Sequence, residues 1–520
     1  LPGWLPPLIA AAAAILSWLL GWRGVDLPAQ IYRVSLFHRA GLTLWDSQWY
    51  GGHWTLDYTV IFPPVAGVLG LTTTAAVSAG GAALAFDRLV VDHFGPSGRV
   101  GSVLFAVGTT VQLAIGQLPF LLGEALALGA CWAAARRRWP LAVVLGLLAT
   151  LSSPLAGAFL GLAIAAWLLA EWPRRAWEPV LILAAVALPI VITAVVFPGQ
   201  GGFPYPPLDF VVELGVALVI AFIVPRGQRV LHTAAILYVL ATVASFVIPS
   251  PIGGNVGRLA ECAAIPLGAC VLWPRRKLLL VVVAVPIALL QWTPAWGAMT
   301  SNRSAPSTHE DYYQPLVAEL TKHPQPLGRV EVVPTAFHWE AAYVAPQIPL
   351  ARGWERQLDL ADNPLFYDAD RLDAAAYRAW LMDNGVRFVA LSDAPLDFAG
   401  VEEARLVDAG VPGLVPAWSN AHWRVFAVAG STGIVSGPAR LSGMSAERID
   451  LDATAAGSVT LRVRFNRYWT VTSGTACMSE GPDKWIVLHV MGQERVTLEL
   501  RFAPSDPDRS SGCTDEAQGP

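Results

Sequence analysis

The residues best suited to chemistry lie together near the N-terminus, in the long segment 23–65. Asp26 follows closely after an apolar run, and Asp46 stands among aromatic side chains. Aromatic rings pack on the apolar face of a sugar, and carboxylates accept hydrogen bonds from its hydroxyl groups. We therefore take Asp26 and Asp46 as candidate catalytic carboxylates. The candidate sugar-binding or acceptor-binding residues are Trp45, Trp49, Tyr50 and His53. The alternative is an amphipathic helix at the membrane surface, whose Trp and Tyr mark the interface.

Glu124 is a third candidate catalytic carboxylate, because it stands inside an apolar run. A carboxylate within a membrane helix costs roughly 2.5–3.5 kcal/mol on insertion scales, so it is usually interior and functional. The alternative is a glutamate near the interface that reaches water.

The segment 249–262, PSPIGGNVGRLAEC, has the features of an anion site. Its glycines leave the backbone accessible, and Arg258 and Asn255 stand where an apolar helix is expected to begin. Together with Arg33, these residues are candidates for binding a phosphate. The alternative for Arg258 is a side chain that extends along the helix to reach water.

The composition requires these residues to be held mainly by membrane helices. The chain is 54% hydrophobic and 14% charged, whereas a soluble domain carries nearer a quarter charged residues. This excludes a disordered protein, a basic nucleic-acid binder and an ordinary cytosolic enzyme. Eleven apolar runs approach the length of a membrane span. They lie at about 5–22, 60–86, 100–117, 119–135, 139–152, 154–172, 177–197, 209–225, 229–248, 258–274 and 278–296.

The distribution of basic residues predicts the orientation in the plasma membrane. Residues 1–299 contain 16 Lys and Arg, and 12 of these fall in loops that share one side if the N-terminus is cytoplasmic. Eleven spans then place the rest of the chain outside. Because the chain begins at Leu1 rather than Met, we expect an N-terminal piece to be missing. The run 5–22 is expected to be a retained helix rather than a signal peptide, and 139–152 either spans or re-enters.

The acidic second half has the pattern of exported domains. After a polar linker at 297–312, helix and strand patterns predict an α/β domain at 313–430. Alternation with period two predicts a β-sandwich at 431–504, followed by a disordered tail at 505–520. The fold class is thus an α-helical polytopic membrane domain followed by extracytoplasmic α/β and β-sandwich regions.

The five cysteines agree with this division. Cys477 and Cys513 lie in the exported part and are expected to form one disulfide. The other three lie in apolar spans, and no Cys/His spacing of a metal site is present in the sequence. Soluble-enzyme motifs such as a P-loop or HExxH are also missing from the sequence.

The order of features resembles the GT-C superfamily of integral-membrane glycosyltransferases: a first helix, a long outer loop with an early Asp, many helices and an exported domain. More narrowly, VDLPAQIYR, LWDSQWYGGH, IFPPV and PIGGNVGRL resemble actinobacterial membrane proteins labelled "6-pyruvoyl-tetrahydropterin synthase-related". That label describes no pterin chemistry in such membrane chains. The strings HWEAAYVAP and LARGWERQLD are similar to the same group.

The resemblance implies an inverting transfer from a polyprenyl-phosphate sugar to a glycan or glycolipid of the cell envelope. Asp26 would be the general base, and Arg258 would hold the phosphate. Relatives often carry two acidic residues close together in the first loop, whereas here Asp46 follows Asp26 at a distance. The resemblance therefore leaves the cofactor unknown, with a divalent cation as an open question. The alternative function is non-enzymatic: a lipid or glycolipid transporter, or an assembly scaffold.

Overall fold

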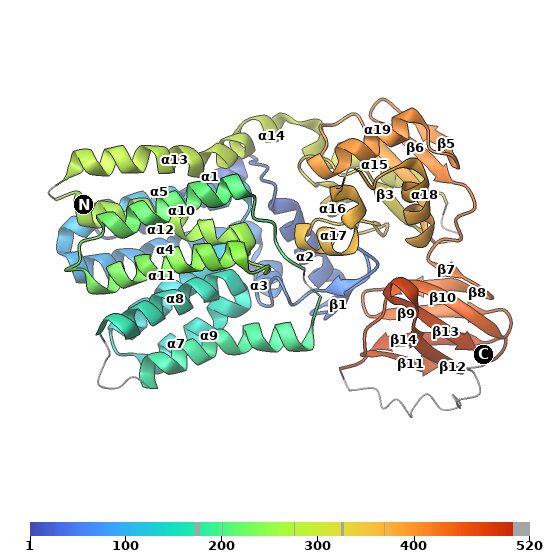
Figure 1. Ribbon diagram of the computed structural model, residues 1–520, viewed down its shortest axis with the longest axis horizontal. Helices are drawn as coiled ribbons and strands as arrows, with labels where there is room; N and C mark the ends of the chain where they lie inside the picture. Colours follow the sequence, from blue (N-terminus) through green and yellow to red (C-terminus); the bar gives the residue numbers. More distant parts are fainter. Residues whose placement is uncertain (172–176, 200, 275, 324–326, 369, 503–520) are drawn as a thin grey trace. The chain divides into compact units, whose positions relative to one another are not determined.

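The computed structural model describes the chain except for residues 172–176, 200, 275, 324–326, 369 and 503–520. The chain divides into two compact units (Figure 1). The helical unit comprises Leu1–His38 and Leu56–Ala305. The second unit comprises Arg39–Thr55 and the chain from Pro306 onward.

The helical unit is built from helices α1 to α14 (Figure 1). Each of the eleven predicted runs contains a helix. The helices are α1 (Leu5–Leu19), α2 (Leu27–Ala40), α3 (Phe62–Leu69), α4 (Leu71–Phe94), α5 (Arg99–Ile115), α6 (Leu118–Ala135), α7 (Trp139–Ser152), α8 (Pro154–Glu171), α9 (Trp177–Val196), α10 (Pro207–Ile223), α11 (Arg229–Val247), α12 (Arg258–Leu272), α13 (Lys277–Met299) and α14 (Ser301–Ser304).

The run predicted at 60–86 differs from the structure, because it is two helices rather than one. Gly70 separates α3 from α4 with a φ of 83°, in the left-handed region that glycine adopts without strain. Helix α4 then continues to Phe94.

Within the part of the chain that the structure describes, seven helical stretches are long and apolar enough to cross a membrane, and α1 and α7 are shorter apolar helices. These stretches indicate a membrane protein. The count of about eleven spans and the orientation stay predictions. Small residues allow the helices to approach one another closely. Ala10 and Ala14 of α1 are buried, as are Ala79 and Ala82 of the neighbouring helix α4.

In the second unit, four strands form a mixed sheet of order β3-β4-β6-β5. The strands are β3 (Arg329–Val332), β4 (Val386–Ser392), β5 (Leu414–Ser419) and β6 (Trp423–Val428). Only β3 and β4 run parallel, and the other pairs are antiparallel. The accompanying helices are α15 (Glu310–Leu320), α16 (Glu340–Tyr343), α17 (Arg356–Asp362), α18 (Ala374–Asp383) and α19 (Val401–Ala409). The strands predicted near 329, 386 and 422 are therefore present.

The segment 297–312, predicted as a linker, is largely helical. It contains the end of α13, then α14, the short 3₁₀ helix η3 (Pro306–Thr308) and the start of α15. Its polar side chains bond to the main chain of these turns: the Thr300 hydroxyl donates to Trp296 O, and Ser304 donates to Ser301 O. The boundary between the two units, after Ala305, falls within this segment.

The β-sandwich consists of two four-stranded antiparallel sheets, of order β12-β13-β10-β7 and β11-β14-β9-β8. The strands are β7 (Val435–Ser436), β8 (Ala439–Met444), β9 (Arg448–Ala453), β10 (Gly457–Arg464), β11 (Trp469–Ser473), β12 (Ala476–Glu480), β13 (Trp485–Val490) and β14 (Arg495–Leu500). Val459, Leu461 and Val463 of β10 are fully buried, which is the predicted alternation of period two. Cys477 takes part in a disulfide bond. Cys513 and the predicted tail 505–520 lie outside the described residues.

A hairpin from the first loop also belongs to the second unit, which corrects the predicted boundary at 1–296. Strands β1 (Trp45–Asp46) and β2 (His53–Trp54) pair antiparallel. Hydrogen bonds join the hairpin to later parts of the unit, among them Leu350 N–H to Gln48 O, Tyr50 hydroxyl to Glu355 O, and Arg464 N–H to Gly51 O.

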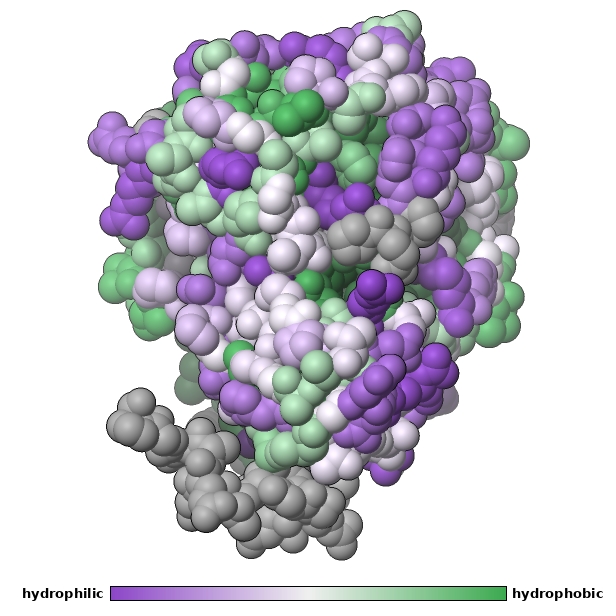
Figure 2. Space-filling view, turned by 90° about the vertical axis from the view of Figure 1, so that its right-hand side faces the viewer, coloured by the Kyte–Doolittle hydropathy of each residue, from purple (hydrophilic) through white to green (hydrophobic). Residues whose placement is uncertain are grey.

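Hydrophilic residues are spread over the face that Figure 2 shows, and its hydrophobic residues form separate patches. This distribution suits a surface in contact with water.

Candidate functional site

The helical unit brings Asp26 and Arg258 into direct contact. Arg258 Nη2 lies 3.6 Å from Asp26 Oδ2, and the two side chains are 21% and 12% exposed. The two residues are more than two hundred positions apart in sequence, and both were candidate site residues from the sequence. A sugar phosphate held between them would require a separation of roughly 6–12 Å, given hydrogen-bond reach at each end. The structure instead has them ion-paired.

Close backbone packing fixes Asp26 at the start of α2. The Asp26 N–H donates to Ile115 O, at the end of α5, over 3.0 Å. Gly116 ends α5 with a φ of 93°, and a Cβ there would lie 2.5 Å from the main-chain nitrogen of Leu27. A Cβ on Gly24 would lie 2.1 Å from Ile115 O. Both positions therefore require glycine, and together they hold Asp26 against α5.

Arg258 is the first residue of α12 and follows the 3₁₀ turn η2 (Gly253–Gly257). Its guanidinium carbon lies 5.9 Å from the centre of the Phe120 ring, at the start of α6. Asn255 lies in η2, within one turn of Arg258. A Cβ on Gly257 would lie 2.5 Å from a carboxylate oxygen of Glu213, so a larger residue there would have to displace that side chain. The predicted anion segment is thus a tight turn that presents Arg258 toward Asp26.

Arg33, predicted as a phosphate ligand, lies on α2. It is buried on α2, with its guanidinium 3.9 Å from the centre of the Tyr58 ring, and it lies 3.5 Å from Gln30 Oε1. Arg33 therefore packs within the helical unit. It lies on the same face of α2 as Asp26 and Gln30, because residues spaced by three and four share a helix face.

Glu124 forms a second polar group with residues from two other helices. Gln112 Nε2, on α5, lies 2.9 Å from Glu124 Oε2 on α6 and 2.9 Å from Cys262 Sγ on α12. Glu124 was identifiable from the sequence, whereas Gln112 was not, because a single Gln within an apolar run has no diagnostic spacing.

The predicted sugar-binding aromatics have a packing role in the second unit. Trp45, Trp49, Tyr50 and His53 are each at most 7% exposed. The Trp49 ring stacks on the His53 ring with centroids 5.4 Å apart, and the Trp45 ring meets the Trp469 ring edge-on at 6.4 Å. Their large apolar area is buried within the unit, so these rings do not form an open platform for a sugar.

Asp46 is likewise fully buried, and its Oδ1 accepts the Gln48 N–H over 3.1 Å. Because it fixes the turn of the hairpin in the second unit, its position does not support the predicted catalytic role.

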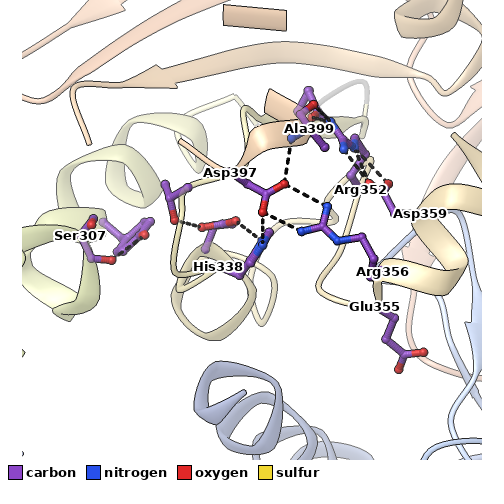
Figure 3. A network of polar contacts seen from close by, with 12 residues as sticks. Ser307, His338, Arg352, Glu355, Arg356, Asp359, Asp397 and Ala399 are labelled. Carbon is purple, nitrogen blue, oxygen red and sulfur yellow. Dashed lines mark hydrogen bonds and ion pairs between the residues drawn. The ribbon is translucent and has the colours of Figure 1, made fainter. Parts of the chain in front are cut away.

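The α/β part of the second unit contains a polar network that the sequence analysis did not identify (Figure 3). Asp397 lies between His338 and Arg356: Arg356 Nη2 is 2.6 Å from Asp397 Oδ2, and His338 Nε2 is 3.3 Å from the same oxygen. His338 Nδ1 also lies 3.3 Å from Glu340. Burial alone would lower the pKa of His338. The hydrogen bonds to Asp397 and Glu340 outweigh this effect and raise the pKa to about 9. His338 also has a φ of 54°, which is strained for a residue with a side chain.

A second cluster surrounds Arg352. Its guanidinium lies 2.6 Å from Asp359, 3.2 Å from Glu403 and 3.9 Å from Glu331. Burial raises the pKa of Glu403 to about 7. Burial and the neighbouring carboxyl group of Glu403 together raise the pKa of Glu331 well above its usual value. Three carboxyl groups thus share one buried arginine, an arrangement that favours the protonated form of Glu331 and Glu403.

Two signals in the sequence mark these clusters. Glu331 stands between two valines in strand β3, where all four residues are buried, and this is an unusual position for a charge. The strings HWEAAYVAP and LARGWERQLD contain His338, Arg352, Arg356 and Asp359. These residues connect loops of the α/β part to one another, so the network rigidifies this part of the chain.

Among the residues that the structure describes, no group of three or more His, Cys, Asp or Glu side chains is arranged to hold a metal ion. No family model matches the sequence, and the search of curated proteins found no match. The geometry of the chain's own residues therefore has to carry any functional conclusion.

Proposed function

We propose that this chain is a GT-C-type membrane glycosyltransferase. It would transfer a sugar from a polyprenyl-phosphate donor to an envelope glycan or glycolipid on the outer side of the plasma membrane. The observation that carries the proposal is the pairing of Asp26 with Arg258 at 3.6 Å, at the starts of two helices. A carboxylate suits a general base, and a guanidinium suits a phosphate.

An apolar cavity in the same unit supports a lipid-linked donor. The cavity has a volume of about 250 Å³ and is lined by apolar side chains of α8, α10, α11, α12 and α13. Leu259 and Ala260, which directly follow Arg258, are part of the lining. A phosphate at Arg258 would therefore have room for its hydrocarbon chain along the same helix, α12.

The Asp26–Arg258 ion pair suggests the order in which donor binding, deprotonation of the acceptor and sugar transfer would occur. Donor phosphate competes with Asp26 for Arg258, so donor binding releases the Asp26 carboxylate. Asp26 then accepts the proton of the acceptor hydroxyl, whose oxygen attacks the anomeric carbon and forms the new glycosidic bond. The bond from that carbon to the phosphate oxygen breaks, and polyprenyl phosphate leaves with the electron pair. Arg258 stabilises the charge on the leaving phosphate, and the attack inverts the anomeric carbon.

The apolar cavity also favours one non-enzymatic function, the carriage of a lipid or glycolipid. A carrier needs the cavity and the cation but has no need for a base. A requirement for the Asp26 carboxylate would therefore distinguish a transferase from a carrier.

The test is transfer of labelled sugar by the purified full chain in nanodiscs, with envelope membranes as the acceptor. Asp26→Asn is expected to lose transfer at least 100-fold while it still binds polyprenyl phosphate. The matched control is Asp92→Asn, which removes a carboxylate from an exposed ion pair with Arg136. Full transfer by Asp26→Asn would refute the base assignment, and donor binding without any transfer by the wild type would favour the carrier.

A further inference from the structure

A second layer of polar side chains lies one helical turn beyond the Asp26–Arg258 pair. On α6, Glu124 is four residues after Phe120, and on α12, Cys262 is four residues after Arg258. Residues four apart lie on the same face of a helix, about 6 Å apart along its axis. The second layer therefore lies next to the Asp26–Arg258 pair along both α6 and α12. Both Glu124 and Cys262 are only partly buried.

Gln112 organises this second layer. Its Nε2 donates to Glu124 and contacts Cys262 Sγ, both over 2.9 Å, so its amide oxygen has to point elsewhere. Gln112 is 4% exposed, and its Oε1 has no hydrogen-bond partner among the described residues. A buried acceptor without a partner is unfavourable, and most buried polar atoms in proteins have one.

The layer thus offers a ligand two acceptors, the Glu124 carboxylate and the Gln112 amide oxygen. Groups that can meet them are donors, such as hydroxyls. A carboxylate on the ligand would instead be repelled by Glu124.

We propose that Glu124 and Gln112 bind the transferred sugar through its hydroxyl groups, and that this sugar is neutral rather than a uronic acid. The inference rests on the proposed function, because Arg258 has to hold the donor phosphate one turn away. It gives Glu124 the role of a specificity-determining residue instead of a general base.

The test is equilibrium binding by the purified full chain in nanodiscs with three probes: polyprenyl phosphate, polyprenyl-phosphate glucose and polyprenyl-phosphate glucuronic acid. The wild type is expected to bind the glucose probe at least ten-fold more tightly than the glucuronic acid probe. Glu124→Gln should reduce that preference at least five-fold and leave binding of polyprenyl phosphate unchanged. Glu124→Asp, which keeps the charge, should retain the preference for glucose.

Glu171→Gln is the matched control, since Glu171 is an exposed carboxylate of the same unit that accepts a bond from Trp167. If Glu124→Gln keeps the full preference for glucose, the inference is wrong and the proposed function still stands. A wild type that prefers the glucuronic acid probe also overturns the inference alone. Failure of the wild type to bind polyprenyl phosphate would overturn the proposed function itself, and the inference with it.

Discussion

Raising the pH should weaken the α/β part of the second unit, because it buries carboxyl groups that hold protons when folded. Glu403 has a pKa raised from 4.5 to about 7 by burial, and the pKa of Glu331 is raised as well. The folded state keeps a proton that the unfolded chain releases above pH 4.5. Stability is therefore lost as the pH rises from about 4.5 through 7. For Glu403 alone the loss is about 3 kcal/mol, at 1.36 kcal/mol per pH unit.

His338 adds to this loss at higher pH. Its pKa is raised from 6.5 to about 9, so its stabilising charge is complete below pH 6.5 and is lost as the pH rises through 9. The α/β part should therefore be most stable at mildly acidic pH.

The measurement is hydrogen exchange followed by mass spectrometry on the full chain in nanodiscs at pH 5 and pH 8. Peptides from β3 and α19, which carry Glu331 and Glu403, should lose about 100-fold in protection after correction for the intrinsic rate. Strand β10 of the sandwich, with its buried apolar side chains, is the internal reference.

Glu331→Gln tests whether the loss of protection comes from deprotonation of buried carboxyl groups rather than from a general effect of high pH. Both oxygens of Glu331 are buried without a hydrogen-bond partner among the described residues, so an amide imitates the protonated acid. The variant should match the wild type at pH 5 and be more protected at pH 8. Equal loss of protection in β3, α19 and β10, or no gain from Glu331→Gln, would refute the reasoning.

Three further substitutions test other parts of the structure. Trp49→Ala should destabilise the hairpin by about 3–5 kcal/mol, measured by hydrogen exchange of residues 45–54, whereas Leu42→Ala, at a 63% exposed position, should have little effect. Gly116→Ala should push α2 away and lower sugar transfer at least ten-fold. Gly70→Ala has similar backbone strain and nothing within 4 Å of the new Cβ, so it should retain most transfer. Arg352→Met should destabilise the α/β part by about 3–5 kcal/mol, because three carboxyl groups lose their cation. The same exchange measurement tests this, and normal protection in the variant would show that the cluster contributes nothing to stability.

The helices of the helical unit were the most predictable part of the fold. Apart from the run at 60–86, the apolar runs correspond to helices within a few residues. The break at Gly70 was missed, because glycine is also tolerated inside a membrane helix and its φ is not visible in a sequence. Period-two alternation predicted the sandwich, since one face of each strand has to be apolar.

The candidate site was predicted only in part. Asp26 and Arg258 were identifiable because a charge beside a glycine-rich turn or at a helix start is unusual in an apolar chain. The roles of Trp49 and its neighbours were not identifiable, because an aromatic cluster suits burial as well as sugar binding. Only the fold shows that the hairpin belongs to the second unit and that Gln112 contacts both Glu124 and Cys262. Such contacts join residues far apart in sequence, and no local pattern encodes them.

The most direct test of the central claim is an experimental structure of the full chain with polyprenyl phosphate bound. The account predicts that the Asp26–Arg258 contact, 3.6 Å in the present structure, opens and that the guanidinium of Arg258 contacts the phosphate. The hydrocarbon chain should enter the cavity beside Leu259. An ion pair that stays closed, with the phosphate bound elsewhere, would contradict the proposed transferase site.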